Sequence, residues 1–180
     1  MADALLPTGF KQLFTPRRIS ARVRKLAKDI DSLYGNEPLV VICVLKGAFV
    51  FFSDLVRFLR NKNLEVDFVR LSSYGDGTAS SGRITVGKDV EISLDGKHVL
   101  IVEDIVDSGR TMHALLQRFA ARNARSLRLA AFIDKRERRE IEINVDFAAF
   151  RMSSGFAVGY GLDYAERWRA LPAVYEITTE

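Results

Sequence analysis

The spacing of apolar residues along the first third of the chain predicts a helix, a strand and a second helix. A stripe with alternating steps of four and three residues predicts a first helix that Gly35 ends. Its members are Ile19, Val23, Leu26, Ile30 and Leu33. The unbroken apolar run at 39–45 is too short for a core helix and is typical of a strand buried on both faces in a parallel sheet. Residues 47–59 are expected to form the next helix.

The pattern then changes to alternation and afterwards loses its periodicity. Leu64, Val66 and Phe68 alternate with acidic residues, which predicts a strand over 64–71. Residues 72–87 contain four glycines and four serines, so we expect a long mobile loop or a loose hairpin there, and such segments often act as functional lids. The remaining expected elements are strands at 98–102, 127–133, 145–150 and 156–160, a helix at 109–122, and an irregular C-terminal tail.

Strands that alternate with helices predict right-handed βαβ units, and therefore an α/β fold with a mostly parallel central sheet flanked by helices. The chain has 180 residues, of which 48% are hydrophobic, so it can bury a core of about one ordinary domain. No internal repeat and no linker rich in Pro or Ser divides it. We therefore expect a single domain over residues 1–180.

Composition indicates where the protein is located, but it says little about the reaction. No stretch approaches the roughly 20 uninterrupted apolar residues of a membrane helix, and residues 1–10 lack the pattern of a signal peptide, so we expect a cytoplasmic protein with no membrane partner. The single cysteine, Cys43, lies in an apolar run and is expected to be a buried structural thiol. The net charge of +4 and the pI of about 9.3 favour polyanionic partners in general, although a mild basic excess usually means only a solvated surface.

The most informative segment is an apolar strand that runs into an acidic turn and then into a helix. Its sequence from Val99 to Thr111 is VLIVEDIVDSGRT. Ligands of open α/β sheets bind at such strand ends. Ser108, Gly109 and Thr111 suit a backbone wrapped around a phosphate, because glycine permits close approach, hydroxyls donate hydrogen bonds, and a helix N-terminus offers unpaired N–H groups. Arg110 could add positive charge.

The acids in this segment would repel a phosphate, and a sugar explains their presence. Glu103 and Asp104 can accept hydrogen bonds from the hydroxyls of a ribose whose 5-phosphate is held by the turn. The alternative is that the acids only cap the next helix, for which Asp107 or Ser108 would be adequate. Three acids in five residues exceed what capping requires. The pattern therefore favours a ribose 5-phosphate site.

The segment 103–111 resembles the phosphoribosyl-pyrophosphate signature of the type I phosphoribosyltransferases. Further matches, in chain order, make residues 10–178 similar to the hypoxanthine-guanine members of that family. They are Leu45-Lys46-Gly47, Ser73-Tyr74, Asp134-Lys135 and Phe156 to Tyr164. The resemblance implies transfer of a phosphoribosyl group from 5-phosphoribosyl-1-pyrophosphate to hypoxanthine or guanine in purine salvage. It also implies a small hood from residues 1–15 and 151–180, and a homodimer or homotetramer.

The resemblance gives roles to residues that contact the donor. Leu45, Lys46 and Gly47 match a tripeptide that contacts pyrophosphate and whose first peptide bond can be cis, and Arg169 matches an arginine that binds pyrophosphate. Ser73 and Tyr74 match the lid. Asp107 matches the proposed general acid/base near N7 of the purine. Taken alone, Lys46-Gly47 would be interpreted as a plain strand-to-helix turn.

Other matches give roles at the base and the metal. Lys135 matches the lysine that reads the 6-oxo group, which adenine lacks; its alternative is one more member of an exposed basic cluster at 135–139. Phe156 matches the aromatic residue that stacks on the base, and Ala157 the backbone that reads the base edge. Asp163 matches an acid that helps to position a metal, and it completes the implied base-binding set with Lys135, Phe156 and Ala157. The stretch 136–139 is more charged than in the bacterial members, which often place a proline nearby.

The donor and leaving group carry many negative charges, which implies Mg²⁺ with Glu103, Asp104 and Asp163 nearby, largely through water. No His/Cys set suggests zinc, and His98 and His113 are interpreted as structural. Two rival functions stay open. One is a regulatory protein on the same fold that binds RNA or DNA, although no nucleic-acid partner is expected because no recognised module accompanies the charge. The other is the same chemistry on adenine or xanthine.

Overall fold

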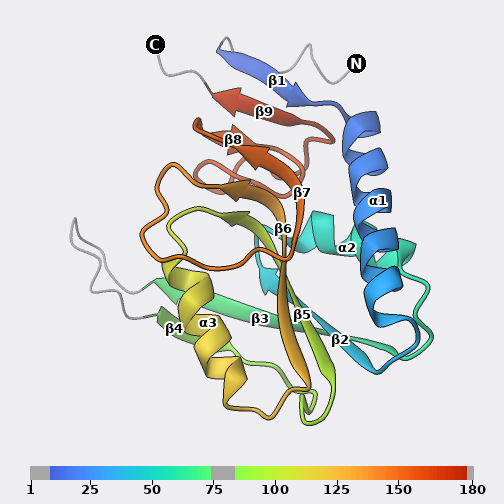
Figure 1. Ribbon diagram of the computed structural model, residues 1–180. Helices are drawn as coiled ribbons and strands as arrows, with labels where there is room; N and C mark the ends of the chain where they lie inside the picture. Colours follow the sequence, from blue (N-terminus) through green and yellow to red (C-terminus); the bar gives the residue numbers. More distant parts are fainter. Residues whose placement is uncertain (1–8, 74–83, 178–180) are drawn as a thin grey trace.

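The computed structural model describes residues 9–73 and 84–177, which form a six-stranded sheet, a three-stranded sheet and three helices (Figure 1). The helices are α1 (Pro16–Tyr34), α2 (Phe49–Phe58) and α3 (Arg110–Ala120). The strands are β1 (Phe10–Phe14), β2 (Leu39–Leu45), β3 (Leu64–Ser73), β4 (Ile84–Lys88), β5 (His98–Val106), β6 (Ser126–Lys135), β7 (Phe147–Met152), β8 (Ala157–Val158) and β9 (Val174–Ile177).

The large sheet has the strand order β4-β3-β2-β5-β6-β7, and all its pairings are parallel except that of β4 with β3. The expected mostly parallel α/β sheet is confirmed. The expected segment 72–87 is in part a hairpin, because β3 extends to Ser73 and β4 begins at Ile84. The rest of that segment lies outside the described residues.

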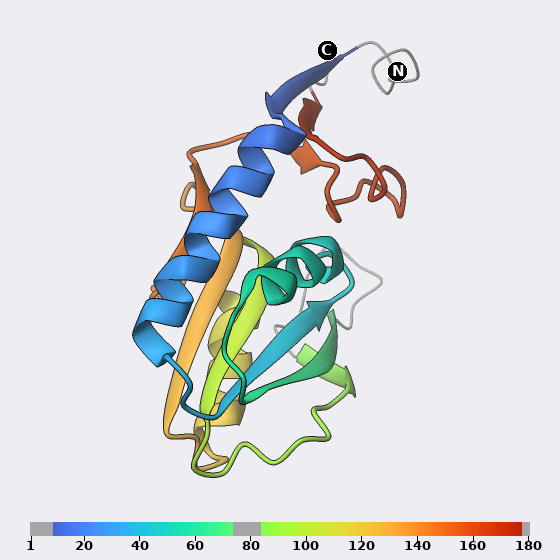
Figure 2. The ribbon, with the colours of Figure 1, turned by 90° about the vertical axis from the view of Figure 1, so that its right-hand side faces the viewer.

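The unbroken apolar runs arise because both faces of the sheet are covered. Along β2, Leu39, Val41 and Cys43 face α1 and α2, while the residues between them pack in a second core with α3. Figure 2 shows α1 and α2 on one side of the sheet and α3 behind it. Cys43 is buried as expected; burial first, and then the charges of Glu103 and Asp104, raise the pKa of its thiol to about 12.

Local signals fix both ends of α1. The side chain of Thr15 accepts a hydrogen bond from the N–H of Arg18 (3.2 Å), and Pro16 opens the helix. Gly35 ends it with φ of 55° and donates its N–H to Asp31 O (2.8 Å). The prediction of Leu33 as the last core position is wrong, because Leu33 is 48% exposed and Tyr34 is buried instead. A straight helix has 3.6 residues per turn, so a stripe of steps averaging 3.5 drifts off the buried face by its last turn.

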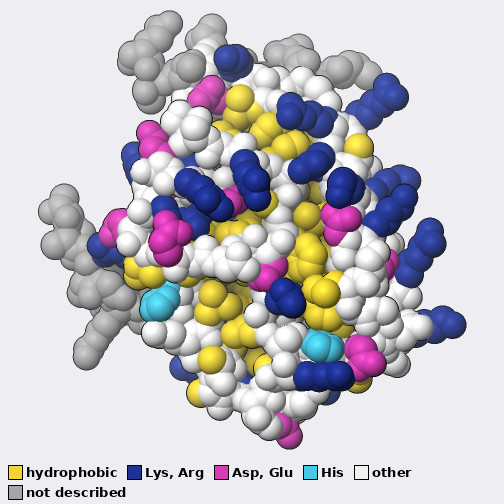
Figure 3. All heavy atoms as spheres, viewed as in Figure 1, with side chains coloured by type: hydrophobic (Ala, Val, Ile, Leu, Met, Phe, Trp, Pro, Cys, Tyr) yellow, Lys and Arg dark blue, Asp and Glu magenta, His cyan; other side chains and the backbone are white. Residues whose placement is uncertain are grey.

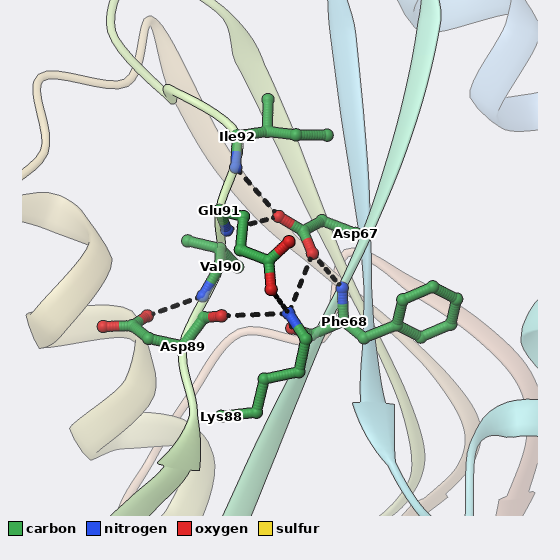
Figure 4. Close-up of polar contacts among 7 residues, drawn as sticks. All are labelled: Asp67, Phe68, Lys88, Asp89, Val90, Glu91 and Ile92. Atoms are coloured by element: carbon green, nitrogen blue, oxygen red, sulfur yellow. Dashed lines mark hydrogen bonds and ion pairs between the residues drawn. The ribbon is translucent and has the colours of Figure 1, made fainter.

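The expected strand is confirmed as β3, and one of its acidic residues is buried. Val66 and Phe68 are partly exposed, whereas Asp67 is 5% exposed. The Asp67 carboxylate accepts N–H groups from Glu91 (2.6 Å) and Ile92 (3.0 Å), and Lys88 Nζ lies 3.4 Å away (Figure 4). A buried carboxylate is stable where hydrogen bonds and a cation compensate its charge, and these partners come from a segment distant in sequence.

The three-stranded antiparallel sheet, in the order β1-β9-β8, joins the two ends of the described chain (Figure 1). Phe10 is paired with Ile177, and Ala157 with Glu176. The C-terminal tail is therefore not irregular as expected, since residues 174–177 form a strand. Figure 2 shows this small sheet beyond one end of the large sheet.

The Lys and Arg side chains are unevenly spread over the surface. Lys and Arg side chains gather along the α1 side of the view in Figure 3, with acidic side chains among them. Lys25 pairs with Asp29 on this helix, and most other described ion pairs are also partly exposed. Within 9–73 and 84–177, no helix is both long and apolar enough to cross a membrane.

Candidate active site

The predicted site residues gather where the large sheet faces the small one. β2, β5 and β6 are parallel neighbours, so their carboxyl ends lie at one edge of the sheet. Two cavities, of about 160 and 200 Å³, lie at this edge, and both are lined by Asp104, Ile105 and Asp107. A ligand with two chemically different parts could therefore occupy both cavities at once.

The smaller cavity is formed by the end of β5 and the turn that opens α3. It is lined by all of the predicted ribose and phosphate residues except Arg110: Glu103, Asp104, Asp107, Ser108, Gly109 and Thr111. Gly109 has φ of 84° and directly precedes α3, whose first N–H groups have no partner within the helix. Arg110 instead donates Nε to Glu140 Oε2 (2.7 Å) on the partly exposed rim.

The two adjacent acids of this cavity differ in their surroundings. Glu103 is 8% exposed, and it accepts the N–H of Asp104 (2.9 Å). Burial first, and then the neighbouring Asp104 charge, raise the pKa of Glu103 well above its ordinary value. The Asp104 carboxylate accepts the N–H of Ile105 (2.6 Å) and reaches both cavities. Asp104 is thus the better placed of the two acids to accept hydroxyl hydrogen bonds.

The larger cavity lies between the ends of β5 and β6 and the segment around β8. Four of its lining residues are the predicted base-binding set, Lys135, Phe156, Ala157 and Asp163. Ala157 is buried, whereas Phe156 is 49% exposed at the mouth and packs edge-to-face with Tyr164 at 5.6 Å between centroids. An exposed aromatic ring at the mouth of a cavity can stack on a flat ligand.

Lys135 and Asp107 face each other in the larger cavity. Lys135 Nζ lies 3.8 Å from Asp107 Oδ2, and the Lys135 side chain is 11% exposed. Lys135 is therefore a buried cavity lysine and is not part of an exposed basic cluster. The other oxygen of Asp107, Oδ1, is buried and has no hydrogen-bond partner among the described residues. A buried oxygen without a partner is rare, and a proton-bearing ligand atom would satisfy it.

The tripeptide after β2 lies against the acidic strand end. The peptide bond between Leu45 and Lys46 is cis. Gly47 packs so closely on β5 that a Cβ at this position would overlap the Asp104 carboxylate. The absence of a side chain at Gly47 is therefore what allows Asp104 to occupy its place.

Acidic side chains neutralise the two predicted pyrophosphate-binding cations. Lys46 Nζ contacts Glu166 Oε1 at 3.0 Å. Arg169 Nη2 contacts Asp163 Oδ1 (2.9 Å) and Glu166 Oε2 (3.3 Å), and its Nη1 donates to Gly161 O (2.9 Å). Glu166 thus bridges Lys46 and Arg169 at a place where a second anion could bind.

The predicted lid can be located only in part. Ser73 is the last residue of β3, and Tyr74 lies outside the described residues.

In the part of the chain that the structure describes, no three His, Cys, Asp or Glu side chains are arranged to hold a metal ion. The acids of the site offer only oxygen ligands, which fit Mg²⁺ provided that most of its ligands come from substrate and water.

The cavities also contain residues that sequence reasoning missed. In the larger cavity they are Ile105, Ile133, Met152, Gly155 and Leu162, and in the smaller one Val106 and Met112. Most are apolar, and the sequence marks them as core residues because a cavity wall and a core need the same side chains. Ile105 lies inside the acidic motif, between Asp104 and Asp107, and this position could have indicated that it lines the site.

Comparison with known proteins agrees with this geometry. The phosphoribosyl transferase domain family matches residues 9–165. The chain is 44% identical to the hypoxanthine-guanine phosphoribosyltransferase of Aquifex aeolicus (93% of this chain, 94% of that one) and 41% identical to that of Bacillus subtilis (92% and 96%). A crystal structure of the Bacillus anthracis hypoxanthine-guanine phosphoribosyltransferase superimposes with a TM-score of 0.87 and 37% identity, covering 93% of this chain and 98% of that one. The chain belongs to the phosphoribosyltransferase family, among its hypoxanthine-guanine members.

Proposed function

We propose that this enzyme transfers the 5-phosphoribosyl group from 5-phosphoribosyl-1-pyrophosphate to hypoxanthine or guanine, giving IMP or GMP and pyrophosphate in purine salvage. The observation that carries the proposal is the pair of adjoining cavities that share Asp104, Ile105 and Asp107. One cavity opens on the N-terminus of α3, which suits a phosphate, and the other has an aromatic ring and a buried lysine, which suit an oxopurine.

The donor would lie along the edge of the sheet. The turn at 108–111 would bind the 5-phosphate through its N–H groups and hydroxyls, and Glu103 and Asp104 would accept the ribose hydroxyls. Lys46, with the backbone of Leu45 and Gly47, and Arg169 would bind the pyrophosphate. Positive charge develops at the anomeric carbon as the bond to pyrophosphate breaks, and the nearby carboxylates would stabilise it.

Asp107 would act as the general acid/base. Its buried Oδ1 has no partner among the described residues, and Asp107 lines both cavities, where it could reach N7 of a purine whose N9 faces the anomeric carbon. As Asp107 takes the N7 proton, the electron pair of N9 would form the bond to the anomeric carbon while the bond from that carbon to pyrophosphate breaks. Lys135, 3.8 Å from the other oxygen of Asp107, would donate to the 6-oxo group and so disfavour adenine.

Phe156 would stack on the base and the backbone at Ala157 would read its edge, while Asp163 would help to position Mg²⁺. When bound, Mg²⁺ would neutralise the pyrophosphate, with Glu103, Asp104 and Asp163 as outer carboxylates. The lid role of Ser73 and Tyr74, a single working domain with a hood, a homodimer or homotetramer, and a cytoplasmic location stay predictions. Light scattering of the purified protein tests the oligomeric state.

The test is to incubate the protein with Mg²⁺ and the donor, and to offer hypoxanthine, guanine, xanthine and adenine separately while nucleotide and pyrophosphate are measured. We expect both products with hypoxanthine or guanine, and much less with adenine. Asp107→Asn, purified in the same way, controls for contaminating host enzyme. No product with any of the four bases would contradict the proposal and favour the regulatory alternative.

A further inference from the structure

Arg139 is the most enclosed cation next to the candidate active site. Its side chain is 5% exposed, although the sequence places it in a charged surface stretch. Its Nη2 donates to Asp134 Oδ1 at 2.7 Å, and Asp134 is itself only 1% exposed. The neighbouring Arg138 is exposed, and no hydrogen bond or ion pair of its side chain is found within residues 9–73 and 84–177. Burial of a guanidinium is costly unless its donors are used, which points to a specific task for Arg139.

The remaining donors of Arg139 bind backbone carbonyls, mainly at the ends of β5 and β6. Nε donates to Asp107 O (2.8 Å), and Nη1 donates to Ile143 O (3.5 Å). The two hydrogens of Nη2 are shared between Asp134 and the carbonyls of Val106 (3.0 Å) and Lys135 (3.1 Å). The parallel pairing of β5 with β6 ends with Val106 opposite Asp134. One side chain thus ties the two strands together at the point where their own ladder stops.

The two residues that follow Arg139 bind the next backbone carbonyl of the turn, that of Ser108. The N–H groups of Glu140 (3.0 Å) and Ile141 (3.1 Å) both donate to Ser108 O. A Cβ at Gly109 would overlap Ile141 O and approach Arg139, so the segment fits closely under the turn. None of residues 139–141 lines either cavity. Three successive carbonyls, at 106–108, are therefore bound outside the cavities, where they cannot repel a phosphate.

We propose that Arg139 is a positioning residue that sets the place of Asp107 relative to Lys135. Arg139 binds the backbones of Asp107 and Lys135. In the proposed function Asp107 is the general acid/base and Lys135 reads the 6-oxo group, so this inference rests on that function. Arginine suits the task because its planar fork offers five donors in fixed directions. Lysine keeps the charge but has no fork, and it could not bind Asp134 and the four carbonyls together.

The test compares Arg139→Lys with Arg138→Lys, a matched change one residue away. For each we would measure kcat, KM for the base, KM for the donor, and the ratio of kcat/KM for hypoxanthine over adenine. We expect Arg139→Lys to lower kcat/KM for hypoxanthine by about ten- to a hundredfold, since misplacement by about 1 Å can cost this much. The base ratio should fall, and KM for the donor should change about threefold or less, because Glu140 and Ile141 still bind the turn. Arg138→Lys should match the parent.

Wild-type kinetics under the same conditions separate this inference from the proposed function. An active wild type together with an Arg139→Lys variant of unchanged kcat and base ratio would overturn the positioning role and leave the function standing. If the wild type is inactive with all four bases, the function fails. A crystal structure of Arg139→Lys then decides the inference, since an unchanged separation of Asp107 and Lys135 would overturn it. If Arg139→Lys does not fold, Asp134→Asn takes its place. We expect this variant to lower kcat/KM for hypoxanthine too, but by less. Kinetics equal to those of the parent would contradict the positioning role.

Discussion

The carboxylate of Glu166 accepts a hydrogen bond of 3.0 Å from Lys46, and it therefore pairs with a cation that is proposed to bind pyrophosphate. Lys46 first, and Arg169 second, lower the pKa of Glu166, so this side chain is an anion at neutral pH. An incoming pyrophosphate must compete with it for both cations. Glu166 is therefore an internal competitor of the donor.

We expect Glu166→Gln to lower KM for the donor and the inhibition constant of free pyrophosphate, each by about two- to fivefold, the scale of exposed ion pairs. Steady-state kinetics with product inhibition measures both constants. Glu65→Gln, which breaks the exposed pair of Glu65 with Lys97, is the matched control and should change neither. A higher donor KM in Glu166→Gln would instead mean that Glu166 holds Lys46 ready for the donor.

Asp107→Asn should keep donor affinity and slow turnover. The amide keeps the shape of the side chain but cannot take the purine proton, and general acid/base residues contribute about 10² to 10⁴ in rate. Calorimetric titration with the donor and Mg²⁺, beside single-turnover kinetics, separates the two effects. Loss of donor binding in this variant would mean that Asp107 is structural.

Lys135→Ala should weaken selection of 6-oxopurines. The lysine is the only proposed donor to the 6-oxo group, and a site built to hydrogen-bond a substrate group discriminates strongly against an analogue that lacks it. We expect the ratio of kcat/KM for hypoxanthine over adenine to fall at least about tenfold. Lys97→Ala, at the opposite end of the sheet, is the control. An unchanged ratio would remove Lys135 from the base site.

Gly47→Ala should abolish most activity while the protein stays folded. A methyl group at Gly47 would overlap the Asp104 carboxylate, so either that carboxylate or the tripeptide after β2 must move. Since Asp104 lines both cavities, a shift of about 1 Å should cost about a hundredfold in kcat/KM. Kinetics and thermal unfolding would be measured together. Gly87→Ala is the control for adding a methyl group to a glycine, because Gly87 has no positive φ and a Cβ there would make only ordinary contacts, the nearest at 3.8 Å. Normal kinetics in Gly47→Ala would show that Asp104 tolerates displacement.

Asp67 should make the stability of the enzyme depend on pH in the acid range. Burial alone would raise its pKa, but hydrogen bonds from three backbone N–H groups and from Lys88 lower it below the ordinary value of 3.8. A lowered folded-state pKa means that the stabilisation is fully present above about pH 4 and is lost as the pH falls through that pKa.

Asp67→Asn should therefore lower the free energy of unfolding at pH 7 by about 2 kcal/mol and reduce the loss of stability between pH 5 and pH 2. Urea unfolding at a series of pH values measures both effects. Glu91→Gln is the matched control, since it alters an exposed partner of the same Lys88. Equal stability of Asp67→Asn and the parent at pH 7 would contradict the assignment.

Much of this fold could be predicted because its local and long-range requirements agree. The run at 39–45 is apolar on both faces since helices cover both, and Gly35 ends α1 as its sequence indicates. The acidic motif placed Glu103, Asp104 and Asp107 in one site because strand, turn and helix are contiguous in sequence. Periodicity and local motifs identify such elements.

Leu33 is an error of helix pitch, but the other features that the sequence did not indicate share one physical cause, which is compensation by partners distant in sequence. Asp67 faces inward because N–H groups 24 and 25 residues away satisfy it. Arg139 is buried because Asp134 and four carbonyls use its donors. Part of the C-terminal tail forms strand β9 because it pairs with β1, which is distant in sequence. Single-sequence patterns report a residue's own preference and are silent about such partners.

The pairing of β1 with β9 sets the order in which the molecule can be completed. Phe10 must wait for Ile177, so a ribosome has made nearly all of the described chain before the first strand finds its neighbour. Closing so long a loop is slow compared with forming the βαβ units, and it comes last. The acidic turn can therefore form before β8 has β9 to pair with, and the cavity that Ala157 lines is completed only after that pairing.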